Sequence, residues 1–296
     1  GRPETIRGVG YNVIHWDLTT KERRRRYNSD FAQMREVGMN TILGWDHQEF
    51  DELTLEKAEK YGLGVVMPYL LPSHGEYGNP VYEEQLEREV MEWVQRYRDY
   101  PALRMWGIGN EVIHGMGTDP EAKPASRAFA RFYVRLVDAV HAIDPDHPVI
   151  YRDAEDEYIE PLREALKADG VHRPWLVYGM NFFTLRVAEV VRDWSKKGMD
   201  VPLAISEFAP SGLIHEDRPN GYVKLWRAFA GHSNLVLGGF AYVWSTEGPE
   251  AIDRVMGLVD DEGLPVDGSL DALRKVFRGH DSKASHSGRR TSPRRP

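Results

Sequence analysis

The 296-residue sequence predicts an α/β fold of the (β/α)8 TIM-barrel class, in a single domain. Two observations lead to this prediction. Eight short apolar runs recur along the chain, and a segment with helical character separates each run from the next. The runs are apolar almost throughout, which is typical of parallel strands covered by helices. A count of eight favours a closed barrel over an open sheet.

The expected strands are the apolar runs themselves. They are residues 7–15, 39–45, 63–70, 103–110, 148–152, 175–183, 202–208 and 236–244. No stretch of linker composition interrupts the alternation before about residue 279. Residues 1–278 are therefore expected to form the barrel, and residues 279–296 a tail.

The helices expected between the strands are amphipathic. In residues 83–97, one helical face collects the apolar side chains Leu86, Val90, Trp93, Val94 and Tyr97. Residues 125–141 repeat this pattern. Shorter helices are expected over residues 29–37, 52–61, 159–169, 184–197, 220–230 and 269–279. The last of these begins at a serine cap and ends at a glycine.

The net charge of −8 is unevenly distributed. Residues 279–296 carry five Lys or Arg and one Asp, so the preceding residues carry 33 basic and 45 acidic side chains. An acidic body argues against a groove for nucleic acid. The tail is rich in Ser, Arg and Pro, and we expect it to be disordered or the remnant of a linker.

Composition excludes several classes of site. The chain has no cysteine, which rules out disulfides, thiolate catalysis and cysteine-based zinc sites. No apolar run approaches the roughly 18–20 residues of a membrane helix. Neither a convincing metal-ligand spacing nor a nucleotide-binding glycine motif is present, so no cofactor or metal is predicted. The first residues resemble no signal segment, which leaves a mature chain, an excised piece or a cytoplasmic protein.

The fourth expected strand ends in an unusual way, with WGIGNE at residues 106–111. A buried strand does not need two glycines, a carboxamide and a carboxylate at its end, but a site built there does. In (β/α)8 barrels the reactive groups lie at the C-terminal ends of the strands. We interpret the glycines as room for a ligand, and Asn110 and Glu111 as the groups that meet it.

A second carboxylate, Glu207, lies near the end of the seventh expected strand in PLAISEF. Glu111 and Glu207 are expected to face each other across the mouth of the barrel. Two carboxylates that flank a glycosidic bond are the machinery for cleaving it. A separation of about 5–5.5 Å indicates retention of configuration, and a wider one indicates inversion. The surroundings must also make the pKa values of the two carboxyl groups different, so that one of them stays protonated near neutral pH.

Other polar and aromatic residues at strand ends are candidates for substrate binding. They are His15, Trp45, Asp46, Tyr69, Asn110, Asn181, Trp244 and Glu247. Each also has a plainer interpretation, as a helix cap, a packing residue or a solvated loop residue.

Three of these strand ends resemble a known family. WGIGNE, ISEF and the VW of the eighth strand are similar to the motifs of clan A retaining glycoside hydrolases, and most similar to the catalytic barrel of family 2 β-glycosidases. The similarity covers roughly residues 5–278. It is extended by TIRGVGYN, REVGMNTI, AEKYGLGVV, IDPDHPVIY and GLVDDEGLPVDGSLDALRKVF.

The resemblance implies roles for individual residues. It makes Glu111 the acid/base and Glu207 the nucleophile. Asn110 would bond the sugar 2-hydroxyl, and Trp244 would form a flat floor under the sugar.

The chain also departs from the family pattern. Relatives often carry an arginine near the end of the second strand, where Trp45 and Asp46 stand here. The sixth strand commonly supplies Asn-x-Tyr, with the tyrosine against the nucleophile. Here it reads Asn181-Phe182-Phe183, so Tyr178 or another tyrosine would have to supply that hydroxyl. Family 2 enzymes carry β-sandwich domains as well, which implies that this barrel is part of a larger multidomain polypeptide.

The leading hypothesis is a retaining glycosidase or transglycosidase that acts on a β-linked oligo- or polysaccharide, with β-glucans among the expected substrates. One alternative is a non-catalytic carbohydrate-binding barrel. Another is a barrel enzyme of a different class, such as a phosphate-sugar lyase, which would bind phosphate with a glycine-rich loop after the seventh or eighth strand. The residues do not give a location for the protein, and only the resemblance implies one outside the cytoplasm.

Overall fold

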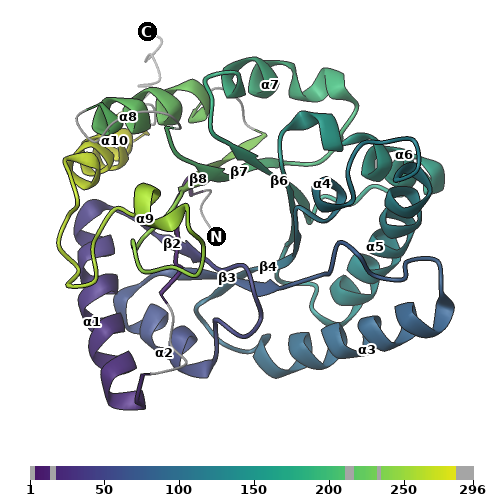
Figure 1. The fold of residues 1–296 in the computed structure, drawn as a ribbon, viewed down its shortest axis with the longest axis horizontal. Helices are drawn as coiled ribbons and strands as arrows, with labels where there is room; N and C mark the ends of the chain where they lie inside the picture. The colour runs from purple at the N-terminus through teal and green to yellow at the C-terminus, as the bar shows by residue number, and fades with distance from the viewer. Residues whose placement is uncertain (1–3, 14–17, 211–216, 232–234, 285–296) are drawn as a thin grey trace, which may run out of the picture.

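A closed barrel of eight parallel strands forms the centre of the protein, in a computed structural model that describes residues 4–13, 18–210, 217–231 and 235–284. Each strand pairs with the next along the chain, and β8 pairs with β1. The helices form a ring around the barrel (Figure 1). The predicted (β/α)8 fold is confirmed.

The strands coincide with the eight apolar runs. They are β1 (Ile6–Gly10), β2 (Thr41–Leu43), β3 (Gly64–Tyr69), β4 (Leu103–Asn110), β5 (Val149–Asp153), β6 (Leu176–Phe182), β7 (Leu203–Phe208) and β8 (Val236–Ala241). β1, β2 and β8 are shorter than expected. The reason is that Tyr11, Val243 and Trp244 are buried in loops beyond the strand ends, so apolar sequence there marks burial and not strand pairing.

The helices alternate with the strands. They are α1 (Thr20–Val37), α2 (Glu52–Tyr61), α3 (Pro80–Tyr97), α4 (Val112–Met116), α5 (Lys123–Ile143), α6 (Glu160–Asp169), α7 (Val187–Asp193), α8 (Arg218–Phe229), α9 (Asp253–Met256) and α10 (Ser269–Ala284), with 3-10 turns η1 (Asp156–Tyr158) and η2 (Trp194–Lys197). None of the helices in the described part of the chain is long and apolar enough to cross a bilayer.

Most helices differ from the prediction by a few residues at their ends, and α7 is shorter than predicted because its last part is the 3-10 turn η2. Two helices, α1 and α10, extend well beyond their predicted bounds. α1 begins before residue 29, because Thr19 and Glu22 form a capping box at its start. The charged turns that follow carry no apolar periodicity, so the pattern concealed them. α10 continues past Gly279, its predicted end, to Ala284. The short helices α4 and α9, in the loops after β4 and β8, were not predicted.

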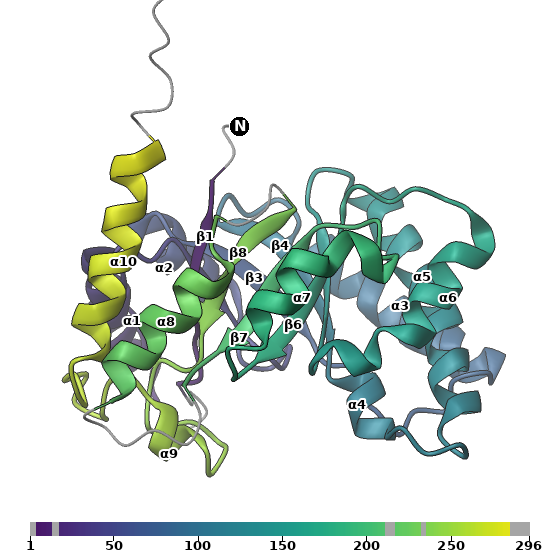
Figure 2. The ribbon, with the colours of Figure 1, turned by 90° about the horizontal axis from the view of Figure 1, so that it is seen from above.

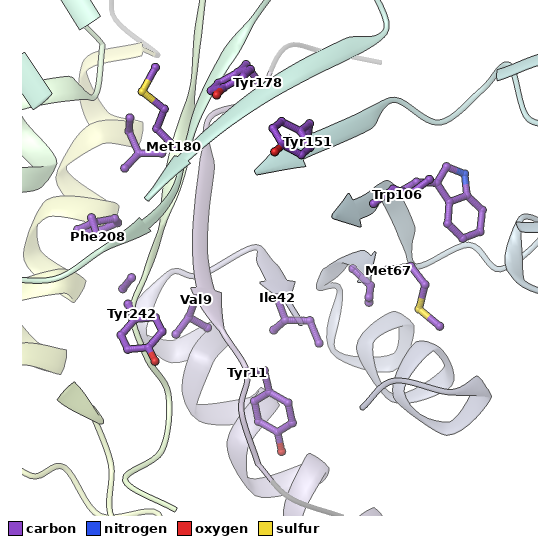
Figure 3. Packing of buried hydrophobic residues seen from close by; sticks show 14 of the residues in the cluster. Val9, Tyr11, Ile42, Met67, Trp106, Tyr151, Tyr178, Met180, Phe208 and Tyr242 are labelled. Carbon is purple, nitrogen blue, oxygen red and sulfur yellow. The ribbon is translucent and has the colours of Figure 1, made fainter. Parts of the chain in front are cut away.

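The core has two layers. The inner layer fills the barrel with one residue from each strand, namely Ile6, Leu43, Val66, Met105, Ile150, Val177, Ala204 and Phe240. The outer layer lies between the strands and the helices, and Figure 3 shows part of it. Because the inner layer plugs the barrel, a ligand is expected to enter from one end. The C-terminal ends of the strands lead to the end that carries α4 and α9 (Figure 2).

WGIGNE owes its glycines to the geometry of this strand. Gly107 pairs with Ile150 and Asn110 with Arg152, so β4 contains one more residue than β5 over this interval. Such a bulge favours a glycine in the left-handed region, and Gly109 has φ +80°. A Cβ on Gly107 would lie 2.9 Å from Val66 in the inner layer. The geometry of the strand therefore explains these glycines, and the interpretation that they make room for a ligand is not needed.

We expect Gly109→Ala to lower the free energy of unfolding by about 1–2 kcal/mol, the cost of holding a residue with a Cβ in the left-handed region. The added Cβ would meet Leu71 and Tyr151 at 3.4 Å, so packing adds little. Urea unfolding at pH 7 measures the change. Gly62→Ala is the matched control. Gly62, at the end of α2, also lies in the left-handed region with φ +67°, but a Cβ there would meet nothing within 4 Å, so this variant carries the backbone cost without any packing contact. A Gly109→Ala variant as stable as wild type would contradict this account of the bulge.

Candidate active site

Glu111 stands at the rim, directly after β4. It is the N-terminal cap of α4 and, with φ +51°, lies in the left-handed region without being a glycine. Its Oε1 accepts a 2.8 Å hydrogen bond from Asn181 Nδ2, and its Oε2 lies 3.3 Å from His114 Nδ1. The side chain is 33% exposed. Glu111 is thus fixed by two neighbours and still open to solvent.

Glu207 lies deeper, near the end of β7, and is 6% exposed. Its Oε1 accepts a 2.7 Å hydrogen bond from the indole N–H of Trp45, which follows β2. Asn181, which bonds Glu111, pairs with Glu207 on the neighbouring strand. The structure therefore brings the two predicted carboxylates together at one end of the barrel.

A second bulge turns Glu207 toward the barrel axis. Met180 of β6 pairs with Ile205, but Asn181 pairs with Glu207, so Ser206 is an extra residue in β7. Ile205 packs in the outer layer. Without the extra residue, strict alternation would place Glu207 on that same outer side. The bulge is therefore what lets Glu207 share the barrel mouth with Glu111.

Asn181 connects the residues of the two strand ends. The Ser206 hydroxyl donates to Asn181 Oδ1 at 2.7 Å, which leaves the Asn181 amide N–H groups to serve as donors. They bond Glu111 at 2.8 Å and Asn110 Oδ1 at 3.3 Å. The predicted residues Asn110 and Asn181 thus lie in one hydrogen-bonded network with Glu111.

A buried arginine lies beneath the carboxylates. Arg152 of β5 has no exposed surface and donates from Nη1 to the Gly44 carbonyl at 2.9 Å, so it crosses the barrel toward the end of β2. Burial lowers its pKa to about 10, against the opposing charges of Glu207, Glu49 and Glu111. Arg152 was not among the residues predicted from the sequence. The signal it offers there is a cation, followed by Asp153, at the end of the apolar run of the fifth strand.

Burial raises the pKa of Glu207 to about 8, and the charge of Glu111 adds to the rise. The Trp45 N–H and the Arg152 charge act in the opposite direction, since both stabilise the carboxylate. Two nearby carboxyls behave in a similar way. Burial raises the pKa of Glu49 and of Asp153 to about 7.

The aromatic residue beside the site is Tyr242 and not Trp244. The chain leaves β8 at Ala241, and the backbone N–H of Trp244 then bonds the Gly10 carbonyl at 2.9 Å. The Trp244 side chain is completely buried. Trp244 therefore offers no face to a sugar, in contrast to the prediction. The Tyr242 ring lies 5.7 Å from Trp45 and 5.8 Å from Phe183, edge-to-face in both cases.

Tyr178 does not supply the hydroxyl that the sixth strand lacks. Its ring packs against Tyr151 and Trp194 in the outer layer, on the helix side of β6 (Figure 3). Tyr178 is three residues before Asn181, and strand alternation places the two side chains on opposite faces. The nearest donor to Glu207 is instead Trp45.

The remaining candidates lie at the edge of the site or away from it. Asp46 accepts the Gln48 N–H at 2.9 Å and shapes the turn after β2. Tyr69 stacks on His47, 4.7 Å away, in a separate surface hollow beside α3. Glu247 forms a 3.6 Å ion pair with Arg26 on the wall of a hollow of about 710 Å³ next to α1. His15 lies outside the described residues.

Within the described ranges, no group of three or more His, Asp or Glu side chains is arranged to hold a metal ion.

Comparisons with known proteins place the fold. No family model matches the chain. A β-galactosidase of Enterobacter cloacae is 24% identical over 280 residues, which cover 89% of this chain. A β-glucuronidase of Bacteroides uniformis superposes on 94% of the chain with a TM-score of 0.73 and 17% identity. A family 2 β-galacturonidase of Eisenbergiella tayi, bound to galacturonate, superposes on 93% with a TM-score of 0.68 and 15% identity.

The chain therefore has the (β/α)8 fold of family 2 glycosidases and a distant sequence similarity to a β-galactosidase. The predicted resemblance to the catalytic barrel of that family is confirmed. The chain spans 23% of the β-galactosidase, 35% of the β-glucuronidase and 51% of the β-galacturonidase.

The pKa of Glu207 gives a test of its burial. The unfolded side chain titrates near 4.5 and the folded one near 8, so the folded protein retains a proton that the unfolded chain has lost between these values. Wild-type stability should fall as the pH rises through this window and level off above it. Glu207→Gln has no such proton. Its advantage in unfolding free energy should grow to the order of 5 kcal/mol above pH 8.

Urea unfolding of both proteins at pH 5, 7 and 9 measures this difference. Glu59→Gln, on the exposed side of α2, controls for the loss of one carboxylate. A gap between Glu207→Gln and wild type that stays constant with pH would show that Glu207 is not buried as described.

Proposed function

We propose that the chain is the catalytic barrel of a retaining glycosidase or transglycosidase that cleaves β-linked oligo- or polysaccharides by double displacement. The observation that carries the proposal is the pair Glu111 and Glu207 at the ends of β4 and β7, coupled by charge and held by neighbouring strand ends. Two carboxyls in such a pair supply the groups that this mechanism needs.

The surroundings favour different roles for the two carboxyls. Glu207 is buried, and Trp45 N–H and Arg152 stabilise its charged form, which suits a nucleophile fixed against the anomeric carbon. Glu111 is partly exposed at the rim, which suits a group that exchanges protons with solvent and reaches the leaving oxygen. We therefore assign Glu207 as nucleophile and Glu111 as acid/base.

Burial and the charge of Glu111 raise the pKa of Glu207 to about 8, so Glu207 retains a proton near neutral pH. The reaction begins from the form in which Glu111 carries it. Glu207 then attacks the anomeric carbon while Glu111 protonates the departing oxygen, and a glycosyl ester forms on Glu207. Glu111 next removes a proton from water or from an acceptor hydroxyl, whose oxygen displaces Glu207.

Asn110 and Asn181 have supporting roles in this proposal. Asn181 fixes Glu111 through a 2.8 Å hydrogen bond and also bonds Asn110. Asn110 is then presented beside the acid/base, where a bond to the sugar 2-hydroxyl would strengthen in the transition state. The relatives are much longer than this chain, and we propose that the barrel acts within a larger multidomain polypeptide.

Glu207→Gly should lower the turnover of aryl β-glycosides by about 10⁴-fold or more, because no covalent intermediate can form. The same variant should still join an α-glycosyl fluoride to an acceptor sugar, since the fluoride resembles the missing intermediate in configuration. Glu59→Gln, remote from the site, should keep wild-type turnover. Unchanged hydrolysis of β-glycosides by Glu207→Gly would remove Glu207 from the nucleophile role.

Glu111→Ala should affect substrates according to their leaving groups. Cleavage of an alkyl β-glycoside, which needs a protonated leaving group, should fall by about 10²–10⁴-fold. A 2,4-dinitrophenyl glycoside needs no such help, so its glycosylation step should be nearly unaffected. Equal losses on both substrates would contradict the acid role. Binding of sugars by wild type without turnover of any glycoside would favour a non-catalytic carbohydrate-binding barrel instead.

A further inference from the structure

We infer that the sugar bound next to Glu207 is a neutral pyranose and not a uronic acid. The inference rests on the proposed function, since it concerns the sugar that Glu207 would attack. It is carried by three features of the strand ends around Glu207, namely an aromatic wall, a concentration of buried carboxylates, and cations that already face carboxylates or carbonyls of the protein.

The aromatic wall consists of Trp45, Phe183 and Tyr242, which follow β2, β6 and β8. Tyr242 is in edge-to-face contact with the other two rings, at 5.7 and 5.8 Å. Trp45 joins the wall directly to Glu207 through its indole N–H. Ring faces of this kind suit the C–H surfaces of a sugar and carry no full charge to pair with an additional anion.

The carboxylates extend beyond the catalytic pair. Asp253 of α9 is 1% exposed, and its Oδ1 accepts the Tyr242 hydroxyl at 2.7 Å. Its charge acts on Glu207 in the same direction as that of Glu111. The wall is therefore backed by a fixed acid on the β8 side. A sugar carboxylate placed against it would be repelled by several like charges in a poorly solvated site.

The cations near the site are buried or already paired. Arg152 donates from Nη1 to the Gly44 carbonyl, while its Nε and Nη2 are buried without a hydrogen-bond partner among the described residues. The residue has no exposed surface, so it presents no accessible N–H to a sugar. At the rim, His114 faces Glu111, and Arg186 forms ion pairs with Glu155 and Asp156. A uronate would have to compete with these carboxylates for a guanidinium or imidazolium partner, whereas hydroxyl groups can bond the carboxylates themselves.

The inferred substrate differs in charge from the substrates named for some solved structures that share the fold. Two of them are described as a β-glucuronidase and as a β-galacturonidase bound to galacturonate. The distant sequence relative is described as a β-galactosidase. The substrate that we infer for this chain is neutral, unlike a glucuronide or a galacturonide.

The test compares 4-nitrophenyl β-D-galactoside and β-D-glucoside with the corresponding β-D-galacturonide and β-D-glucuronide at pH 7. Each pair differs at C6 alone, as a hydroxymethyl group or a carboxylate. We expect kcat/KM to be at least about 30-fold higher for the better neutral substrate than for its uronide. A uronide preferred over its neutral partner would overturn the inference while leaving the proposed reaction intact.

Asp253→Asn tests the source of the discrimination. The asparagine retains an oxygen acceptor for the Tyr242 hydroxyl but removes one charge, so the neutral-to-uronide ratio should fall by about 5–10-fold. Glu59→Gln makes the same change in net charge on α2 and should leave the ratio unchanged. An unchanged ratio in Asp253→Asn would overturn the electrostatic argument, and the ratio cancels losses of activity that affect both substrates.

If wild type turns over none of the four glycosides, the proposed function fails on these substrates, and the charge preference is read from binding. Quenching of tryptophan fluorescence by gluconolactone and by glucaro-1,4-lactone compares a neutral ring with one that carries a carboxylate. Tighter binding of gluconolactone supports the inference, and tighter binding of the acid contradicts it.

Discussion

The site depends on one buried charge, the guanidinium of Arg152. Glu111, Glu207 and Glu49 all contribute negative charge around it, and burial alone would drive protons onto such a group of carboxyls. A cation fixed from β5 to the end of β2 offsets part of that cost and leaves the carboxyls on the open side. The inner apolar layer lies below and closes the barrel, so Arg152 lies between this layer and the carboxyl groups at the mouth of the barrel.

Two bulges give the carboxylates their direction. The extra residues Gly109 in β4 and Ser206 in β7 each break the alternation of a buried strand just before its catalytic candidate. Each strand can then present two consecutive polar side chains, Asn110 and Glu111 on one and Ser206 and Glu207 on the other. The hydrogen bonds from Ser206 through Asn181 to Glu111 exist because both bulges are present.

The same bulges set the limit of what the sequence predicts. Apolar runs identify the strands, and the strand ends identify Glu111 and Glu207, because the position of a residue along a strand can be counted from the sequence. The direction in which its side chain points cannot be counted in this way once a bulge interrupts the alternation. Tyr178 faces the helices, and Trp244 is buried against β1 while Tyr242 takes the place beside Trp45. Arg152 escaped notice because its role depends on a reach across the barrel, which no local pattern records.

The contact between Trp45 and Glu207 shows how the site compensates for its departure from the family pattern. The family resemblance implied a tyrosine hydroxyl from the sixth strand beside Glu207, whereas here an indole N–H reaches Glu207 from the residue after the second strand. An indole donates a hydrogen bond but neither accepts one nor ionises, so it favours the charged carboxylate at every pH. The position at which the resemblance implied a tyrosine is Phe183, and its ring packs against Tyr242. Trp45 thus serves both as the donor to Glu207 and as one ring of the aromatic wall.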